Sequence, residues 1–331
     1  SMGFVLYIGG QKTLAGEITV GRLTEFLAYM TVLQMPVRQL GMLVNSIART
    51  TTSGERLFSV LDEEPDIRDK PDASELEVTD ASLRFDHVSF DYQLGDEKVP
   101  VLKDVSFEIH RGQTLGIVGP PGAGKSTIAH LVPRFYDVTE GSITIDGQDI
   151  RDVTLKSLRS AVSVIQQDIF LFTAGIENNV AYGSPWADRD RIVSATNTAQ
   201  LHSYIDALPK GYETLVGERG VSLSGGQRQR LVIARALLMK PSVLVFDDST
   251  AAIDAATEQR ILSSLRERAS EAVTIVISHR LSSLMHADEI LFIDGGQVVE
   301  RGNHRELLEQ GGRYAALYEL QSNPADESLL E

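Results

Sequence analysis

The chain has 331 residues, which leaves room for more than one domain with a sizeable buried core. Its 46 acidic residues outnumber the 31 Lys and Arg side chains, for a formal net charge of −15. This balance argues against a nucleic-acid partner, because phosphate backbones attract clustered positive charge. The chain contains no cysteine, so disulfides and thiolate metal sites are excluded.

The first sixty residues differ in kind from the rest. Apolar residues fill Gly3–Ile8 and the uncharged run Phe26–Val37, which lies between Glu25 and Arg38. That run falls short of the roughly 20 residues that a helix needs to span a bilayer. From the residues alone it predicts an amphipathic helix packed on a partner, or a helix of a soluble core. The proline- and charge-rich stretch Asp62–Asp80 then predicts a linker.

From about residue 83 the pattern predicts a small antiparallel sheet. Apolar residues alternate along Leu83–Ile109, as they do in strands with one buried face. Further along, Ser142–Ile150 predicts a hairpin around Asp146-Gly147, a dipeptide that favours a two-residue turn.

A complete phosphate-binding loop follows the predicted strand Thr114–Val118. Its sequence is Gly119-Pro120-Pro121-Gly122-Ala123-Gly124-Lys125-Ser126, and Thr127–Val132 after it predicts a helix. Glycines let such a loop turn its N–H groups toward phosphates, and the helix adds the positive end of its dipole. Lys125 is placed to reach the β- and γ-phosphates, and the Ser126 hydroxyl to ligate Mg²⁺.

The second half of this site is predicted at the end of another strand. Val243–Phe246 is an unbroken apolar run, typical of a central parallel strand, and it ends in Asp247-Asp248. We expect Asp247 to face the phosphate-binding loop and to hold Mg²⁺ through its water shell; the simpler alternative is two acids that begin a surface turn. Val273–Ile277 and Ile290–Ile293 predict further strands of the same sheet.

The remaining segments are predicted to be mainly helical. Residues of about 168–231 carry helical patterns. Asn303-His304-Arg305-Glu306 predicts a capping box that opens a helix near the end of the chain. Ser322–Glu331 predicts a mobile acidic tail.

With these motifs in place, about residues 83–321 resemble the nucleotide-binding domain of an ABC transporter of the exporter type. Leu223-Ser224-Gly225-Gly226-Gln227 is similar to the family's signature loop, which binds the ATP of the opposite site, and a helix over Arg228–Met239 is expected after it. Tyr92 matches the aromatic that stacks on adenine. Gln167 matches the glutamine that touches Mg²⁺ and the attacking water.

The resemblance assigns three further roles. ATP contacts are implied for the phosphate-binding loop and for Thr127 after it. Asp254 matches the end of the loop through which paired domains communicate, and His279 matches the switch histidine at the γ-phosphate. Taken singly, Tyr92 is an ordinary strand aromatic and His279 an ordinary surface histidine. Their assignment depends on their order in the chain and their spacing from the phosphate-binding loop.

One departure bears on mechanism. The family's general base is a Glu directly after the Mg²⁺-binding Asp, and this chain has Asp248 there. Asp is one methylene shorter, roughly 1.5 Å less reach for a base that must touch its water. Such a displacement can cost on the order of 10²-fold in rate. In the family this substitution marks asymmetric exporters, so the resemblance implies a weakly hydrolytic site here and an intact signature that completes the partner's site. Ala251, where the family usually has Ser, is a milder departure.

The implied fold is α/β: a P-loop NTPase (RecA-like) core with an antiparallel β subdomain and a helical signature subdomain at about 168–231, preceded by transmembrane-derived helices. Residues 1–60 are expected to be the end of an exporter's membrane domain, 61–82 a linker, 83–321 the nucleotide-binding domain and 322–331 the tail. The last membrane helix is expected at about Arg22–Ala48, after a short loop near Leu14–Gly21. The chain is then part of a longer exporter half that contains further membrane helices.

The implied cofactors are ATP and Mg²⁺, and the implied partner is a second half-transporter, with a heterodimer favoured over a homodimer with symmetric sites. The N-terminal helices would lie in the cell membrane and the nucleotide-binding domain on its cytoplasmic side. Two other classes remain open: a soluble ABC ATPase of DNA repair or translation, and a regulatory module that binds ATP without hydrolysis. The exporter-like segment Gly217-Glu218-Arg219-Gly220 and the acidic charge argue against the first, whereas Asp248 favours the second.

Overall fold

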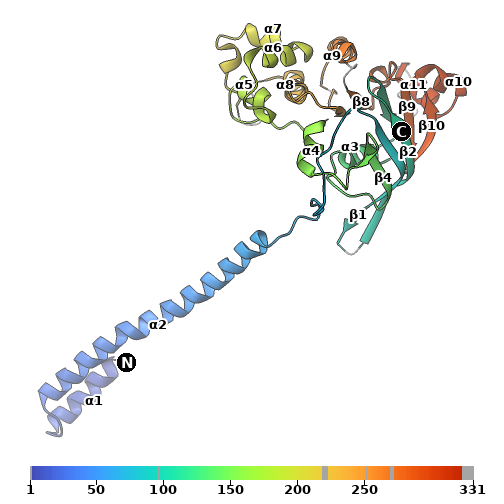
Figure 1. Cartoon of the computed structure of the whole chain (residues 1–331). Coiled ribbons are helices and arrows are strands. Elements are labelled where there is room, and N and C mark those ends of the chain that lie inside the picture. Colours follow the sequence, from blue (N-terminus) through green and yellow to red (C-terminus); the bar gives the residue numbers. More distant parts are fainter. Residues whose placement is uncertain (1, 96, 218–222, 251, 269–271, 323–331) are drawn as a thin grey trace. The chain divides into compact units, whose positions relative to one another are not determined.

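The computed structural model describes residues 2–95, 97–217, 223–250, 252–268 and 272–322 (Figure 1). The chain divides into two compact units, Ser1–Asp66 and Ile67–Glu331. Three of the sequence-based expectations, on Glu218–Gly220, on Ala251 and on the tail after Ser322, fall on residues outside these ranges.

The first unit is a helical hairpin. Helix α1 (Met2–Leu14) packs against α2 (Val20–Leu61), and the two helices approach closely at Gly9, where an added Cβ would lie 2.3 Å from Leu23 Cδ1. The Thr19 side chain caps α2 by accepting a hydrogen bond from the N–H of Arg22. Within the described residues, no helix combines enough length with enough apolar character to cross a membrane.

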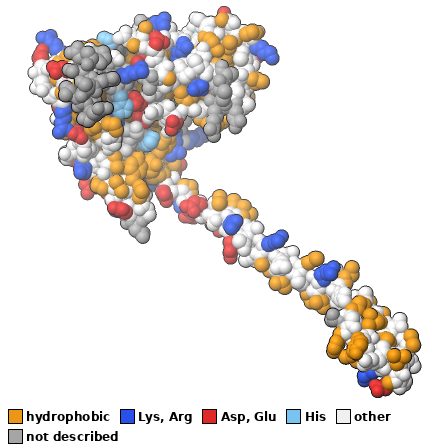
Figure 2. All heavy atoms as spheres, turned by 180° about the vertical axis from the view of Figure 1, so that it is seen from behind, with side chains coloured by type: hydrophobic (Ala, Val, Ile, Leu, Met, Phe, Trp, Pro, Cys, Tyr) orange, Lys and Arg blue, Asp and Glu red, His pale blue; other side chains and the backbone are white. Residues whose placement is uncertain are grey.

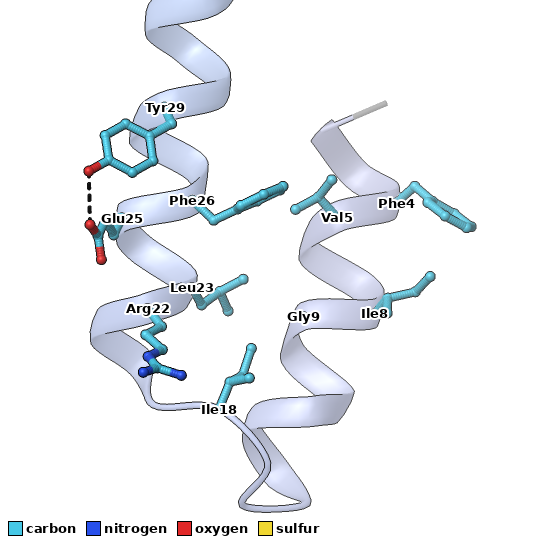
Figure 3. A pocket seen from close by; sticks show the side chains of 10 residues that line it. All are labelled: Phe4, Val5, Ile8, Gly9, Ile18, Arg22, Leu23, Glu25, Phe26 and Tyr29. Carbon is cyan, nitrogen blue, oxygen red and sulfur yellow. Dashed lines mark hydrogen bonds between the residues drawn. The ribbon is translucent and has the colours of Figure 1, made fainter.

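The hairpin leaves much of its apolar surface uncovered. Orange side chains run along most of this unit in Figure 2, and Phe26, Tyr29 and Leu33 are each more than half exposed. A groove of about 560 Å³ lies on this unit, and Val5 of α1 and Leu23 and Phe26 of α2, which point toward one another, are among the residues that line it (Figure 3).

Helix α2 runs thirteen residues beyond the predicted end at Ala48, so that prediction was too short. The polar run after Ala48 continues the helix, and within it three hydroxyls in succession bond to carbonyls four residues back. Thr50 Oγ1 donates to Ser46 O at 2.8 Å, and Thr51 and Thr52 make the same bond one and two residues further along.

Two sheets form the frame of the second unit. A four-stranded antiparallel sheet has the order β2-β1-β4-β5 and a six-stranded sheet the order β10-β9-β3-β8-β7-β6. The strands are β1 (Leu83–Leu94), β2 (Glu97–Ile109), β3 (Thr114–Val118), β4 (Glu140–Ile145), β5 (Gln148–Asp149), β6 (Val162–Ile165), β7 (Val243–Asp247), β8 (Val273–Ile277), β9 (Glu289–Asp294) and β10 (Gln297–Gly302). The predicted antiparallel sheet, the Asp146-Gly147 hairpin and the central strands are all confirmed.

Alternate residues of the central strands face two separate cores. Phe246 and Val276 lie in the core that contains the helical region, whereas Val245 and Ile277 lie in the core shared with the antiparallel sheet. Strands β3, β7 and β8 are buried at every position, as unbroken apolar runs predict. The phosphate-binding loop and Asp247 therefore lie at the ends of strands whose two faces are both packed in a core.

The second unit also contains helices, some of which pack on the six-stranded sheet and some on one another. They are α3 (Lys125–Leu131), α4 (Leu155–Ala161), α5 (Ile176–Val180), α6 (Arg189–Thr198), α7 (His202–Asp206), α8 (Gly225–Leu238), α9 (Ala255–Arg268), α10 (His304–Gln310) and α11 (Arg313–Ser322), with short 3₁₀ turns η1 (Ala181–Gly183), η2 (Gly211–Glu213) and η5 (Leu281–Ser283). Helix α10 opens with the predicted capping box of Asn303 and Glu306.

The predicted linker is held against the domain. The Asp146 carboxylate, in the β4–β5 turn, accepts hydrogen bonds from the backbone N–H groups of Thr79, Asp80, Ala81 and Ser82 at 2.6–3.2 Å. Nearer the start, Asp69 Oδ1 accepts from Leu155 N at 2.7 Å, and Leu76 N donates to Ser157 Oγ at 2.9 Å. We call residues 69–82 the strap, because they lack regular structure yet are tied down by these bonds.

Candidate nucleotide-binding site

The phosphate-binding loop takes the shape that its glycines permit. Gly119 has φ 155°, and an added Cβ there would lie 1.9 Å from Ile293 O; Gly124 has φ 97°, and its Cβ would lie 2.6 Å from Leu102 Cδ2. A side chain at either position would therefore clash. The loop runs from the end of β3 directly into α3, so the first N–H groups of that helix point into the loop.

Lys125 is folded back into its own loop. Its Nζ donates to Gly119 O at 2.9 Å and to Pro120 O at 2.8 Å, carbonyls that occupy the place of phosphate oxygens as acceptors. Burial lowers the pKa of the ammonium, and the nearby carboxylates of Asp248 and Asp247 oppose that shift. A buried ammonium whose hydrogen bonds go to neutral backbone carbonyls is suited to receive a polyanionic ligand.

Asp247 ends β7 and lies against the loop, as predicted. Its Oδ1 accepts a hydrogen bond from Ser126 Oγ at 3.0 Å, and the residue is 5% exposed. Burial raises the pKa of this carboxyl, an effect that the Ser126 hydroxyl and Lys125 reduce. A nearby cation would favour its ionised form.

These residues fit Mg²⁺ in the manner of a nucleotide site. Ser126 and Asp247 together offer a hydroxyl and a carboxylate oxygen, the hard donors that Mg²⁺ prefers. The described residues include no group of three or more His, Cys, Asp or Glu that could hold a metal by themselves. That is the pattern expected where phosphates and water supply most of the ligands.

Asp248 and His279 are in contact. His279 Nε2 lies 3.1 Å from Asp248 Oδ2, and the backbone N–H of His279 donates to Asp248 Oδ1 at 3.3 Å. Asp248 has φ 48°, a left-handed conformation that costs free energy in a residue other than Gly and recurs at functional sites. Its backbone N–H is held by Ile277 O at 2.9 Å, so β8 positions both side chains.

The predicted residues from five segments line one cavity of about 390 Å³. They are Tyr92, Pro121, Gly122, Gly124, Lys125, Ser126, Thr127, Gln167, Asp247, Asp248 and His279, together with Val101 and Ile277. The Tyr92 ring is held edge-on by Phe90 and Tyr136, with ring centroids 4.8 and 5.2 Å away. The Tyr92 hydroxyl lies 3.4 Å from Thr127 Oγ1, so an aromatic ring and a loop with a buried cation share the cavity, as they do in nucleotide sites.

Comparison with known proteins agrees with this geometry. Residues 102–251 match the sequence family described as ABC transporter. The chain is 42% identical over 317 residues to the uncharacterized ABC transporter ATP-binding protein YknU of Bacillus subtilis, covering 96% of this chain and 54% of that protein. It is 41% identical over 318 residues to a putative multidrug export ATP-binding/permease protein of Staphylococcus aureus, covering 96% and 55%.

A solved structure of an ABC exporter is also similar to this chain. A bacterial Atm1-family ABC exporter with ATP bound matches 97% of this chain and 56% of its own, with a TM-score of 0.82 and 42% identity. Residues 102–251 thus resemble the ATP-binding domain of an ABC transporter. One of these relatives is named a putative multidrug export protein, and the solved structure is an Atm1-family exporter that holds ATP. The chain spans about half the length of these relatives.

The predicted signature loop lies outside the cavity. No described residue that lines the cavity comes from Leu223–Gln227. Helix α8 begins at Gly225 rather than at the expected Arg228, because Ser224 caps it: Ser224 Oγ accepts from Gln227 N, and Gln227 Oε1 accepts from Ser224 N. The signature glycines are thus the first turn of a helix.

The loop after β7 packs directly on this helix. Gln229, which sequence analysis missed, is 5% exposed and accepts a hydrogen bond from Ala252 N at 2.9 Å. A Cβ on Gly226 would lie 2.9 Å from Ala252 O. Asp254, at the end of the loop, accepts from Thr257 N at 2.9 Å, a bond that lowers the pKa of its carboxyl. A polar residue two positions after the signature was the signal available for Gln229.

Proposed function

We propose that this chain is the ATP-binding and ATP-hydrolysing subunit of an ABC exporter, which closes with a second subunit around Mg²⁺-ATP to drive transport across a membrane. The observation that carries the proposal is the meeting of Lys125, Ser126, Asp247, Asp248 and His279 in one cavity. The similarity to a putative multidrug export protein and to an ATP-bound exporter supports the same function.

Within this proposal each residue has a role. Tyr92 stacks on adenine, the loop from Gly119 to Thr127 holds the phosphates, and Gln167 orients water. Bound Mg²⁺ would be held by Ser126, Gln167 and Asp247 and would neutralise charge on the phosphates. Asp248 accepts the proton of the attacking water and His279 contacts the γ-phosphate.

We infer that hydrolysis at this site is weak and that a heterodimer is the working unit. Asp248 is shorter than Glu, and its carboxylate already contacts His279 at 3.1 Å rather than reaching freely into the cavity. The signature loop would complete the partner's ATP site, since it faces away from its own. The N-terminal helices would belong to the membrane domain in the cell membrane, with the ATP-binding domain on the cytoplasmic side and no nucleic-acid partner.

A homodimer with symmetric sites is the alternative, and one experiment separates the two. Steady-state ATPase of the assembled transporter is measured with Asp248→Asn, or with Ser224→Asp, which keeps a good helix cap but places a negative charge toward the partner's ATP. We expect Asp248→Asn to change turnover less than about twofold and Ser224→Asp to lower it at least tenfold, with ATP binding retained in both. Turnover silenced by Asp248→Asn but indifferent to Ser224→Asp would contradict the asymmetric proposal.

Asp248→Glu tests reach alone, because it keeps the charge. If positioning limits the base, this substitution raises the ATPase rate of this chain alone, by up to the order of 10² that misplacement can cost. An unchanged rate would mean that the water is already within reach of Asp248.

A further inference from the structure

The side chain of Gln321, on α11, bridges two backbone groups in the loop that carries His279. Its Nε2 donates to His279 O at 2.7 Å, and its Oε1 accepts from Leu281 N at 3.0 Å. Both distances lie within the range of well-formed hydrogen bonds. One amide side chain thus holds the backbone on each side of Arg280, although Gln321 lies forty residues further along the chain.

Helix α11 is firmly anchored at its other end. The Glu300 carboxylate, on β10, accepts hydrogen bonds from Arg313 N and Tyr314 N, the first N–H groups of the helix. Tyr314 is fully buried, bonds to His304 Nδ1 at 2.7 Å, and has its pKa raised by burial to about 12. Because the start of α11 is fixed to the sheet and to α10, its last turn can act as a support (Figure 1).

The space between α11 and the phosphate-binding loop is open. A cavity of about 470 Å³ lies there, lined by Gly119, Pro120 and His279 on one side and by Leu317 and Leu320 of α11 on the other. The loop that carries His279 is therefore not close-packed against α11 on this side. The two hydrogen bonds to Gln321 therefore add to the contacts with Asp248 that restrain this loop.

We propose that Gln321 is a positioning residue for His279, through which the C-terminal helix sets the approach of the imidazole to Asp248 and to the phosphate. A glutamine suits this bridge because its amide can donate to His279 O and accept from Leu281 N at the same time. The proposal rests on the proposed role of His279, so its test has one arm that needs no nucleotide.

The first arm is hydrogen exchange of the whole chain without ATP. The Leu281 N–H is protected by Gln321, so Gln321→Ala should speed exchange of the segment 279–284 about fivefold, the equivalent of one ordinary hydrogen bond. Gln321→Glu keeps the acceptor for the Leu281 N–H and should speed hydrogen exchange of this segment less. Glu319→Gln, an exposed change on the same helix, is the matched control and should leave exchange unchanged. Equal exchange in Gln321→Ala and in the unchanged chain would overturn the proposal.

The second arm is ATP hydrolysis by this chain alone, so that a competent partner site does not mask the effect on its own site. Gln321→Ala should lower kcat about three- to tenfold with ATP affinity unchanged, because the phosphate-binding loop is untouched. In a His279→Ala background the same change should have no further effect. A full additional loss in that background, or a similar loss in Glu319→Gln, would overturn the positioning role. A chain that binds no ATP would reject the proposed function, while the exchange result would still decide whether Gln321 holds the loop.

Discussion

At the scale of single residues, the catalytic end of the cavity is defined by contacts between side chains from neighbouring strands. Asp247 and Asp248 are adjacent in sequence but point to different partners, the first to Ser126 and the second to His279. The positive φ of Asp248 turns the chain at this point and separates the two carboxylates. In the proposed function, Asp247 would serve the metal and Asp248 the attacking water.

The cation of Lys125 should dominate phosphate binding. Lys125→Ala removes the charge from the centre of the loop and should weaken Mg²⁺-ATP binding at least tenfold, about 1.4 kcal/mol. Isothermal titration of the whole chain measures this. Lys156→Ala, the same change at an exposed position on α4, is the control and should bind as the unchanged chain does. Equal affinities for the two variants would reject the assignment of the loop.

At the scale of elements, the strap shows how a segment without regular structure can be fixed by one side chain. Burial of Asp146 opposes its ionisation, but hydrogen bonds from Ser82, Thr79 and Asp80 outweigh it and lower the pKa of the carboxyl. The strap also reaches α4 through Asp69 and Leu76. The strap is therefore bound to the antiparallel sheet through Asp146 and to α4 through these two bonds.

Asp146→Asn should weaken this anchor, because an amide offers one acceptor oxygen instead of two and no charge. The free energy of unfolding should fall by about 1–2 kcal/mol, moderated by the partial exposure of the site. Because the pKa is lower in the folded state, the carboxylate stabilises the fold above its unfolded pKa of about 3.9 and loses that effect as pH falls through the folded pKa.

Urea unfolding at several pH values measures the difference between the two chains. The difference in the free energy of unfolding should have its largest value at neutral pH and should shrink below about pH 4, the unfolded-state pKa of the carboxyl. A difference that stays constant down to acid pH would show that the charge of Asp146 has no part in the anchor.

At the scale of the whole molecule, the two units differ in how they bury apolar surface. The second unit has two cores on either face of its central sheet, whereas the first leaves long stretches of α2 exposed. Exposed apolar surface of this extent marks contact with another apolar partner. The second unit, by contrast, has the cores expected of a self-sufficient fold.

Deletion of residues 1–60 should therefore yield a monodisperse protein whose ATP affinity stays within about twofold of the whole chain, a difference of less than 0.5 kcal/mol. Light scattering and titration test this. Deletion of residues 1–82 is the informative contrast, since it also removes the strap and the bonds to Asp146, and it should lower the midpoint of unfolding. A 1–60 deletion that fails to fold would show that α1 and α2 belong to the core of the second unit.

The sequence by itself determined the elements whose signals are local. Unbroken apolar runs specify β3, β7 and β8, Asp146-Gly147 specifies a turn, and the glycines around Lys125 specify a phosphate-binding loop, because each pattern is tied to backbone conformation. The order of motifs also brought Tyr92, Gln167 and His279 into the prediction, although their roles remain proposals.

Only the tertiary structure decided the contacts between distant segments. Four such contacts each join residues 23 or more positions apart. They are the pairing of Asp248 with His279, the bond of Gln229 to Ala252, the bonds of the strap to Asp146 and the bridge of Gln321. The polar side chains involved look like ordinary surface residues in sequence. Their partners are set by how strands and helices pack, which a local pattern does not encode.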